Sequence, residues 1–226
     1  MSLRQRVRAW VGLELSESVD LVLAHEVLGT EYGSHAVCLE GLGPGSVVYS
    51  FGVGEDVSFD LGLMERTGAE VFAFDPTPRS VAWVREQALP AGFRMHAFGL
   101  AAHDGTLSFA PPANPEHVSH SSVPSGSAGA VEFAVKRLST VARELGHSRL
   151  DVLKMDIEGA EYAVIDDVLA HGPPVDQWLI EFHHGHYGIP VKTTRAAVAR
   201  LRAAGYGLFR ISASGHELSF RRRSRE

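Results

Sequence analysis

The densest group of side chains that could do chemistry is the segment WLIEFHHGHYG, where Glu181, His183, His184 and His186 follow an apolar run. Alternation along an extended strand places Glu181 and His183 on the same face. An imidazole with an ordinary pKa of about 6.5 can take a proton from a hydroxyl near neutral pH, and a neighbouring carboxylate can assist it. We therefore predict an acid–base site with Glu181 and His183 as catalytic residues and His184 and His186 as substrate-binding residues. The sequence does not decide which of the four is the base.

A second group lies in LDVLKMDIEGAEYAVI, where Asp156 ends a buried apolar strand and Glu158 precedes a glycine that lets the backbone approach a ligand. We expect Asp156 to be catalytic and Glu158 to bind substrate. Glu161 follows on a helix, whose dipole favours acidic residues there for structural reasons alone. Asp156, Glu181 and His183 could hold a divalent metal if the two strand ends are adjacent. An acid–base site without a metal would show the same residues, so no metal is assigned.

A third group, SFGVGEDVSFD, follows another apolar run. Gly52 and Gly54 stand at its strand-to-helix turn and let the backbone approach a ligand, although a tight structural turn would select the same glycines. Asp75 ends the next strand, 23 residues after Gly52, close to the separation of about 20 at which an acidic residue meets a ribose diol. Asp75 could instead cap the next helix, but Thr77 before Pro78 already supplies that cap.

The missing glycine at position 57 narrows the choice of nucleoside cofactor. The dinucleotide fingerprint requires a third glycine where this chain has Val57, which disfavours NAD and FAD. No GxxxxGK[ST] loop is present, which disfavours a nucleoside triphosphate held in a P-loop. S-adenosylmethionine carries no phosphate and fits better. A dehydrogenase on a similar sheet and a non-catalytic nucleoside-binding module remain the alternatives.

These groups must be positioned by short apolar strands that alternate with helices, which is the pattern of a Rossmann-like, mostly parallel sheet with helices on both faces. The expected strands are residues 47–51, 70–74, 93–98, 150–155 and 177–182. One expected helix carries a face made of Ala160, Val164, Ile165, Val168 and Leu169, and another begins at Thr193 or Thr194 and ends at Gly205. Residues 207–211 and 216–220 predict a C-terminal antiparallel hairpin, and residues 110–130 a long loop that could act as a lid.

Length and composition set the wider limits. A chain of 226 residues predicts one domain, with residues 1–45 as a helical or irregular cap and residues 46–226 as the α/β core. A net charge of -6 argues against a nucleic-acid partner, and no apolar run reaches the roughly 20 residues of a membrane span. Cys38 is the single cysteine, so a reducing, cytoplasmic location and a small-molecule substrate are the expectations. Oligomeric state stays open.

The segments YSFGVGEDVSFD, EVFAFDPTP, LDVLKMDIEGAEYAVI and WLIEFHH together resemble the FkbM-type methyltransferases, a branch of the S-adenosylmethionine-dependent class I enzymes. The resemblance covers about residues 31–184, and KMDIEGAE is its most specific part. It implies that a segment of this loop lines the methionine part of the cofactor, that Asp75 and Pro76 lie at its ribose and that HAFGLA flanks adenine. The implied cofactor-binding residues are Phe51, Gly52, Val53, Gly54, Asp75, Pro76, Gly99, Leu100 and Asp156.

The activity implied by the resemblance is in-line transfer of the sulfonium methyl group to a hydroxyl of a small metabolite, sugar or natural product. Glu181 or His183 would accept the hydroxyl proton, while Asp156 would orient the cofactor or that base. The family's glycine loop often begins with an acidic residue where this chain has Ser50. We expect Glu31 to Gly33 to compensate by reaching over the site.

Overall fold

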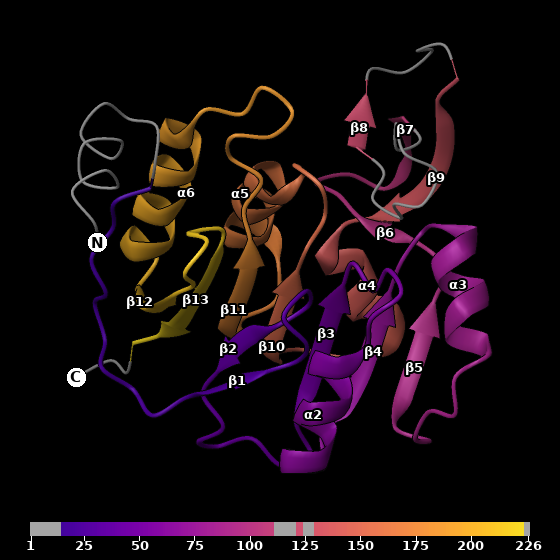
Figure 1. Cartoon of the computed structure of the whole chain (residues 1–226), viewed down its shortest axis with the longest axis horizontal. Helices are drawn as coiled ribbons and strands as arrows, with labels where there is room; N and C mark the ends of the chain where they lie inside the picture. The colour runs from indigo at the N-terminus through magenta and orange to yellow at the C-terminus, as the bar shows by residue number, and fades with distance from the viewer. Residues whose placement is uncertain (1–14, 111–120, 124–128, 224–226) are drawn as a thin grey trace.

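The computed structural model describes residues 15–110, 121–123 and 129–223. Its centre is a seven-stranded sheet in the order β12-β13-β11-β10-β3-β4-β5 (Figure 1). The strands are β3 (Val47–Phe51), β4 (Glu70–Phe74), β5 (Phe93–His96), β10 (Leu150–Met155), β11 (Val175–Glu181), β12 (Tyr206–Ile211) and β13 (Glu217–Arg222). Strands β5, β4, β3, β10 and β11 are parallel, and β13 pairs antiparallel with β11 and β12. The predicted Rossmann-like sheet with a C-terminal hairpin is confirmed.

Strand order reverses at β3, which has the earlier-following strand β4 on one side and the later strand β10 on the other. The crossover connections therefore leave in opposite directions at this point, and a crevice opens at the carboxyl ends of the two strands. All three polar groups found in the sequence follow strands at this edge: the glycine loop follows β3, Asp75 follows β4, and Asp156 follows β10. The topology thus gathers residues that are far apart in the chain.

Helices cover both faces of the sheet, because strand residues of both faces are apolar and buried. On one face, α4 (Leu138–Leu145), α5 (Glu161–His171) and α6 (Val191–Ala203) pack with Tyr49 and Phe72. On the other face, α2 (Ser58–Thr67) and α3 (Pro78–Arg85) pack with Val48 and Val71. Neighbouring residues of one strand thus belong to different cores, as strand alternation requires.

The described part of the predicted cap contains no helix. Residues 15–25 have no regular structure, and β1 (Glu26–Leu28) pairs antiparallel with β2 (His35–Val37). The side chain of Gln177 holds the chain just after β2, since its amide bonds both the N–H and the C=O of Cys38 at 3.0 and 2.8 Å. The expectation of a helical segment is wrong for residues 15–45, where a hairpin docks on the sheet instead, and residues 1–14 lie outside the described residues.

A second, four-stranded sheet was not expected. It has the order β6-β9-β7-β8, from β6 (Gly99–Leu100), β7 (Gly105–Ala110), β8 (Ser121–Val123) and β9 (Val131–Lys136). The prediction of an unstructured loop over residues 110–130 is wrong at β8, which pairs antiparallel with β7. The rest of the lid expectation falls largely on residues 111–120 and 124–128, which lie outside the described residues.

Local signals fixed some element boundaries and missed others. The Thr77 side chain caps α3 by accepting a hydrogen bond from the Ser80 N–H, as expected. Helix α6 begins at Val191, with Pro190 at the N-cap in an extended conformation, and not at Thr193 or Thr194. Thr194 is instead buried within the helix, where its hydroxyl bonds the hydroxyl of Tyr162. Among the described helices, none is long and apolar enough to cross a membrane.

Candidate active site

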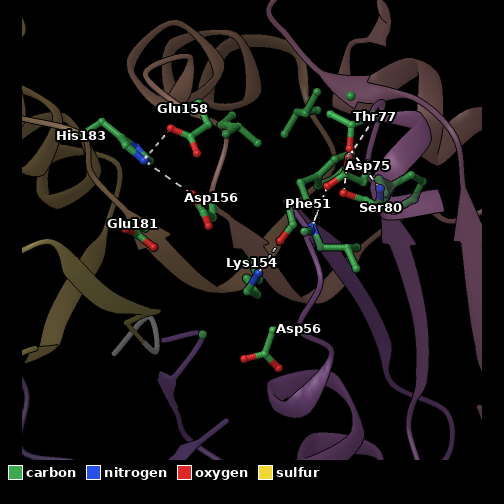
Figure 2. Close-up of a pocket in the computed structure, with 18 of the residues that line it drawn as sticks. Phe51, Asp56, Asp75, Thr77, Ser80, Lys154, Asp156, Glu158, Glu181 and His183 are labelled. Atoms are coloured by element: carbon green, nitrogen blue, oxygen red, sulfur yellow. Dashed lines mark hydrogen bonds and ion pairs between the residues drawn. The ribbon is translucent and has the colours of Figure 1, made fainter. Parts of the chain in front are cut away.

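A cavity of about 470 Å³ opens at the carboxyl ends of β3, β4, β10 and β11. Figure 2 shows Asp75, Thr77 and Ser80 at one end of it and Asp156, Glu158, Glu181 and His183 at the other. Its size suits a small-molecule ligand, for which pockets typically range from about 300 to 1,000 Å³. The cavity therefore joins the nucleoside-type and acid–base groups of the sequence in one space.

The glycine loop is shaped by a very close approach of two strand ends. Gly52 has φ of +83°, and a Cβ placed on it would lie 1.9 Å from the carbonyl oxygen of Asp156. The Asp156 N–H donates to the carbonyl of Phe51 at 3.0 Å, and Lys154 Nζ donates to the carbonyl of Gly52 at 2.9 Å. Only glycine fits here, because any side chain would collide with backbone that cannot move without breaking the β3–β10 pairing.

Asp75 ties the glycine loop to the start of α3. Its Oδ2 accepts the N–H groups of Val53 and Gly54 at 3.1 and 3.0 Å, and its Oδ1 accepts the Thr77 N–H and hydroxyl at 2.8 and 2.7 Å. A carboxylate offers about four acceptor positions, so these bonds use them all. A ribose diol would have to take over positions now held by Thr77 or by the loop, a positioning role that sequence reasoning had not anticipated.

The other residues predicted to bind the cofactor also line the cavity: Phe51, Gly52, Val53, Gly54, Pro76, Gly99 and Leu100. Phe51 stacks on Phe74 with centroids 4.3 Å apart. Phe109 and Phe133, from the second sheet, line the same cavity and lie 5.5 Å apart. Sequence reasoning missed these two phenylalanines, although apolar and polar residues alternate in GTLSFA and VEFAVK.

The acid–base residues converge on His183. Its Nε2 lies 3.6 Å from Asp156 Oδ1 and 3.4 Å from Glu158 Oε2 (Figure 2). Its Nδ1 donates to Glu161 Oε1 at 2.8 Å. Glu161 is fully buried, and the same oxygen also accepts the N–H of Gly159 at 3.0 Å. Glu161, assigned only a structural role from the sequence, thus holds the orientation of the imidazole.

The charges of this group perturb one another. Burial raises the pKa of Asp156 to about 6, with Lys154 lowering it and Glu158 raising it further. Burial together with the charge of Asp156 raises the pKa of Glu181 to about 8. Burial lowers the pKa of His183, but its hydrogen bond to Glu161 and the surrounding carboxylates outweigh that effect and raise it to about 9. Groups that gain and lose protons around neutral pH are suited to acid–base chemistry.

The remaining histidines separate. His186 is exposed and lines the cavity, whereas His184 is buried and is absent from the cavity wall. The ring of His184 stacks on His216 with centroids 4.4 Å apart, and its Nδ1 lies 3.2 Å from the Thr194 hydroxyl. Burial and the neighbouring imidazoles lower the pKa of His184 to about 4. This packing leaves His184 no contact with a ligand in the cavity, contrary to its predicted role in substrate binding.

Glu158 and Tyr187 are held in unusual backbone conformations beside His183. Both have positive φ, of +54° and +51°, and the Tyr187 hydroxyl donates to Glu158 Oε2. Asp156, Glu158 and His183 each bring one potential ligand atom within 4.8 Å of the others, a donor set that a divalent cation could accept. This set contains Glu158 in place of Glu181, which the sequence had grouped with Asp156 and His183.

Known proteins resemble the chain over the segment that builds this site. The model of the methyltransferase FkbM domain matches residues 47–208. Probable methyltransferase-like protein 24 of Rattus norvegicus and of Homo sapiens are each 27% identical over 155 residues, which is 68% of this chain and 37% of theirs. The chain thus spans little more than a third of the length of these relatives. Fibrillarin of Aeropyrum pernix, solved with natively bound S-adenosyl-L-methionine, aligns with 82% of this chain and 69% of its own at 11% identity and a TM-score of 0.46.

Proposed function

Because the chain belongs to the FkbM family of methyltransferases, we propose that it transfers the methyl group of S-adenosylmethionine to a hydroxyl of a small molecule. One observation carries the proposal. The glycine loop tied to Asp75 and the acid–base group around His183 line the same cavity, so a cofactor at the first would present its methyl group toward the second.

The adenosine part of the cofactor would lie between Asp75 and the second sheet. Pro76, Gly99 and Leu100 line this end of the cavity together with Phe109 and Phe133. Apolar and aromatic walls suit the flat adenine ring, whose faces gain from burial. The ribose would replace the Thr77 hydroxyl or the loop amides as a partner of Asp75. S-adenosylmethionine supplies an electrophilic methyl group on a positively charged sulfur.

The acceptor hydroxyl would lie against Asp156, Glu181 and His183. Its oxygen attacks the methyl carbon in line with the sulfur, so an O–CH₃ bond forms, the S–CH₃ bond breaks and S-adenosylhomocysteine leaves. The hydroxyl proton passes to His183, or to Glu181 directly or through water, while Asp156 orients the acceptor. The enzyme mainly brings the reactants together in this geometry, which can supply a large part of the rate.

A small acceptor is favoured by the cavity, which holds a molecule of limited size, and by the net charge of -6, which disfavours a phosphate backbone. Glu158, His186 and Tyr187 border the acceptor end and are proposed to contact the acceptor. An amine acceptor would use the same residues, and comparison of hydroxyl and amine acceptors by mass spectrometry of the methylated product decides between them.

Calorimetric titration with S-adenosylmethionine and S-adenosylhomocysteine tests the proposal, with NADH as control. We expect saturable binding of both, no binding of NADH, and an affinity at least about tenfold lower in Asp75→Ala, which loses charged hydrogen bonds. Thr77→Val is the matched variant, since it removes the same cap but leaves the carboxylate. A folded protein that binds only NADH would show a dehydrogenase instead.

A further inference from the structure

The β1–β2 hairpin lies outside the matched residues 47–208 and yet forms a wall of the cavity. Tyr32, Gly33 and His35 line the cavity from this hairpin, as expected for the segment beginning at Glu31. The Thr30 N–H donates to the Ser58 hydroxyl at 2.8 Å, and the Thr30 hydroxyl donates to Asp56. These bonds attach the hairpin to the first residues of α2, directly after the glycine loop.

His35 has a polar atom that the described protein does not satisfy. The residue is 2% exposed, and its Nδ1 has no hydrogen-bond partner among the described residues. Its ring packs edge-on against Phe59 at 5.7 Å. Burial and the charge of Lys154 hold its pKa well below the usual range, so the imidazole is neutral. A buried polar atom without a partner is costly, and one in a cavity wall points to a ligand that completes it.

Two opposite charges lie beside His35 in the cavity wall. Lys154 is 5% exposed, and the Gly52 carbonyl is the one partner that the described residues give its ammonium group. Burial raises the pKa of Asp56, but hydrogen bonds from Ser58 and Thr30 and the charge of Lys154 lower it overall, so this carboxylate is ionised. Figure 2 shows Lys154 between Asp56 and Asp156, apart from the Asp75 end of the cavity.

We propose that these three residues form a subsite for a zwitterionic α-amino-acid group, with Lys154 and His35 facing its carboxylate and Asp56 facing its ammonium. The inference rests on the proposed function, because S-adenosylmethionine carries such a group at the end opposite adenine. With adenosine at Asp75 and the methyl group toward His183, the amino-acid end extends to the remaining wall, which the hairpin supplies. The hairpin is then part of the cofactor site rather than a passive cover.

Binding of two ligands that differ only in this group tests the subsite. S-adenosylhomocysteine carries the amino-acid end, and 5′-methylthioadenosine lacks it. In His35→Leu we expect the affinity for S-adenosylhomocysteine to fall at least about fivefold while the affinity for methylthioadenosine stays unchanged. Asp56→Asn provides a second variant with the same expected selectivity. His25→Leu is the control, because His25 belongs to the same segment but does not line the cavity.

The outcomes separate this inference from the proposed function. Equal losses for both ligands, or no loss for either, in the two folded variants overturn the subsite while leaving the cofactor assignment intact. A wild-type chain that binds neither ligand overturns the cofactor assignment and the subsite with it. Selective loss of S-adenosylhomocysteine alone supports the subsite and assigns the hairpin to cofactor recognition.

Discussion

Glu161 and His183 are joined by a hydrogen bond of 2.8 Å between Oε1 and Nδ1, although one begins helix α5 and the other follows strand β11. Nδ1 is the donor in this bond, since the ionised carboxylate only accepts. The other ring nitrogen is thereby directed toward Asp156 and Glu158 at the acceptor end of the cavity. A carboxylate behind a histidine is a common way to fix the orientation of a catalytic imidazole.

His183→Ala is expected to lose turnover while keeping its cofactor. General-base catalysis contributes about 10²- to 10⁴-fold, so kcat should fall within that range. His183 does not contact the glycine loop, so the Kd of S-adenosylhomocysteine should stay within about threefold of the wild-type value. Steady-state assays and calorimetry measure the two quantities, with His103→Ala in the second sheet as control. Unchanged turnover would remove His183 from the mechanism.

The pH dependence of the reaction should reveal the proton that His183 carries. Burial lowers its pKa, but Glu161, Asp156 and Glu158 raise it to about 9, so the free base becomes available only as the pH rises. We expect kcat/KM to increase from pH 7 and to level off above pH 9. Glu161→Gln keeps a hydrogen-bond acceptor but removes the charge, so the pKa of His183 should fall and the rise in kcat/KM should move to lower pH. A profile that the substitution leaves in place contradicts this assignment.

Activity is expected to persist after treatment with EDTA. A protonated His183 already balances the charges of Asp156 and Glu158, so a divalent cation would have to displace that proton before binding the three residues. Initial rates before and after chelation provide the measurement. If EDTA abolishes activity and Mn²⁺ restores it in the wild type but not in Glu158→Gln, these three residues bind an essential metal instead.

Gly52→Ala should destabilise the protein far more than a similar change elsewhere. Its Cβ would lie 1.9 Å from the Asp156 carbonyl oxygen, in a backbone conformation with φ of +83°. Gly41 has almost the same φ, +82°, but nothing lies within 4 Å of its added Cβ. Gly41→Ala should therefore cost only the strain of about 1 to 2 kcal/mol, and Gly52→Ala several times more. Urea unfolding compares them, and equal losses would show that the strand ends separate easily.

The sequence by itself determined the sheet and the residues that follow its strands. Buried apolar runs such as VVYSF and LDVLKM, separated by glycine and proline signals, encode strands and turns through local periodicity, and the structure confirms them. The glycine loop, Asp75 and Asp156 were found because each stands directly after such a strand. Parallel strands bring their carboxyl ends to one edge, so their placement at a common cavity followed from the topology.

Only the tertiary structure decided how distant side chains pair. Glu161 and His183 are 22 residues apart, and nothing in the local pattern of KMDIEGAE distinguishes a buried partner of histidine from an acidic residue at a helix start. The separation of His184 from His183, the use of all four acceptor positions of Asp75, and the approach of His35 to the cavity depend likewise on packing between elements. Local periodicity specifies which face of an element is apolar, whereas the contacts of a polar side chain depend on which other element packs there.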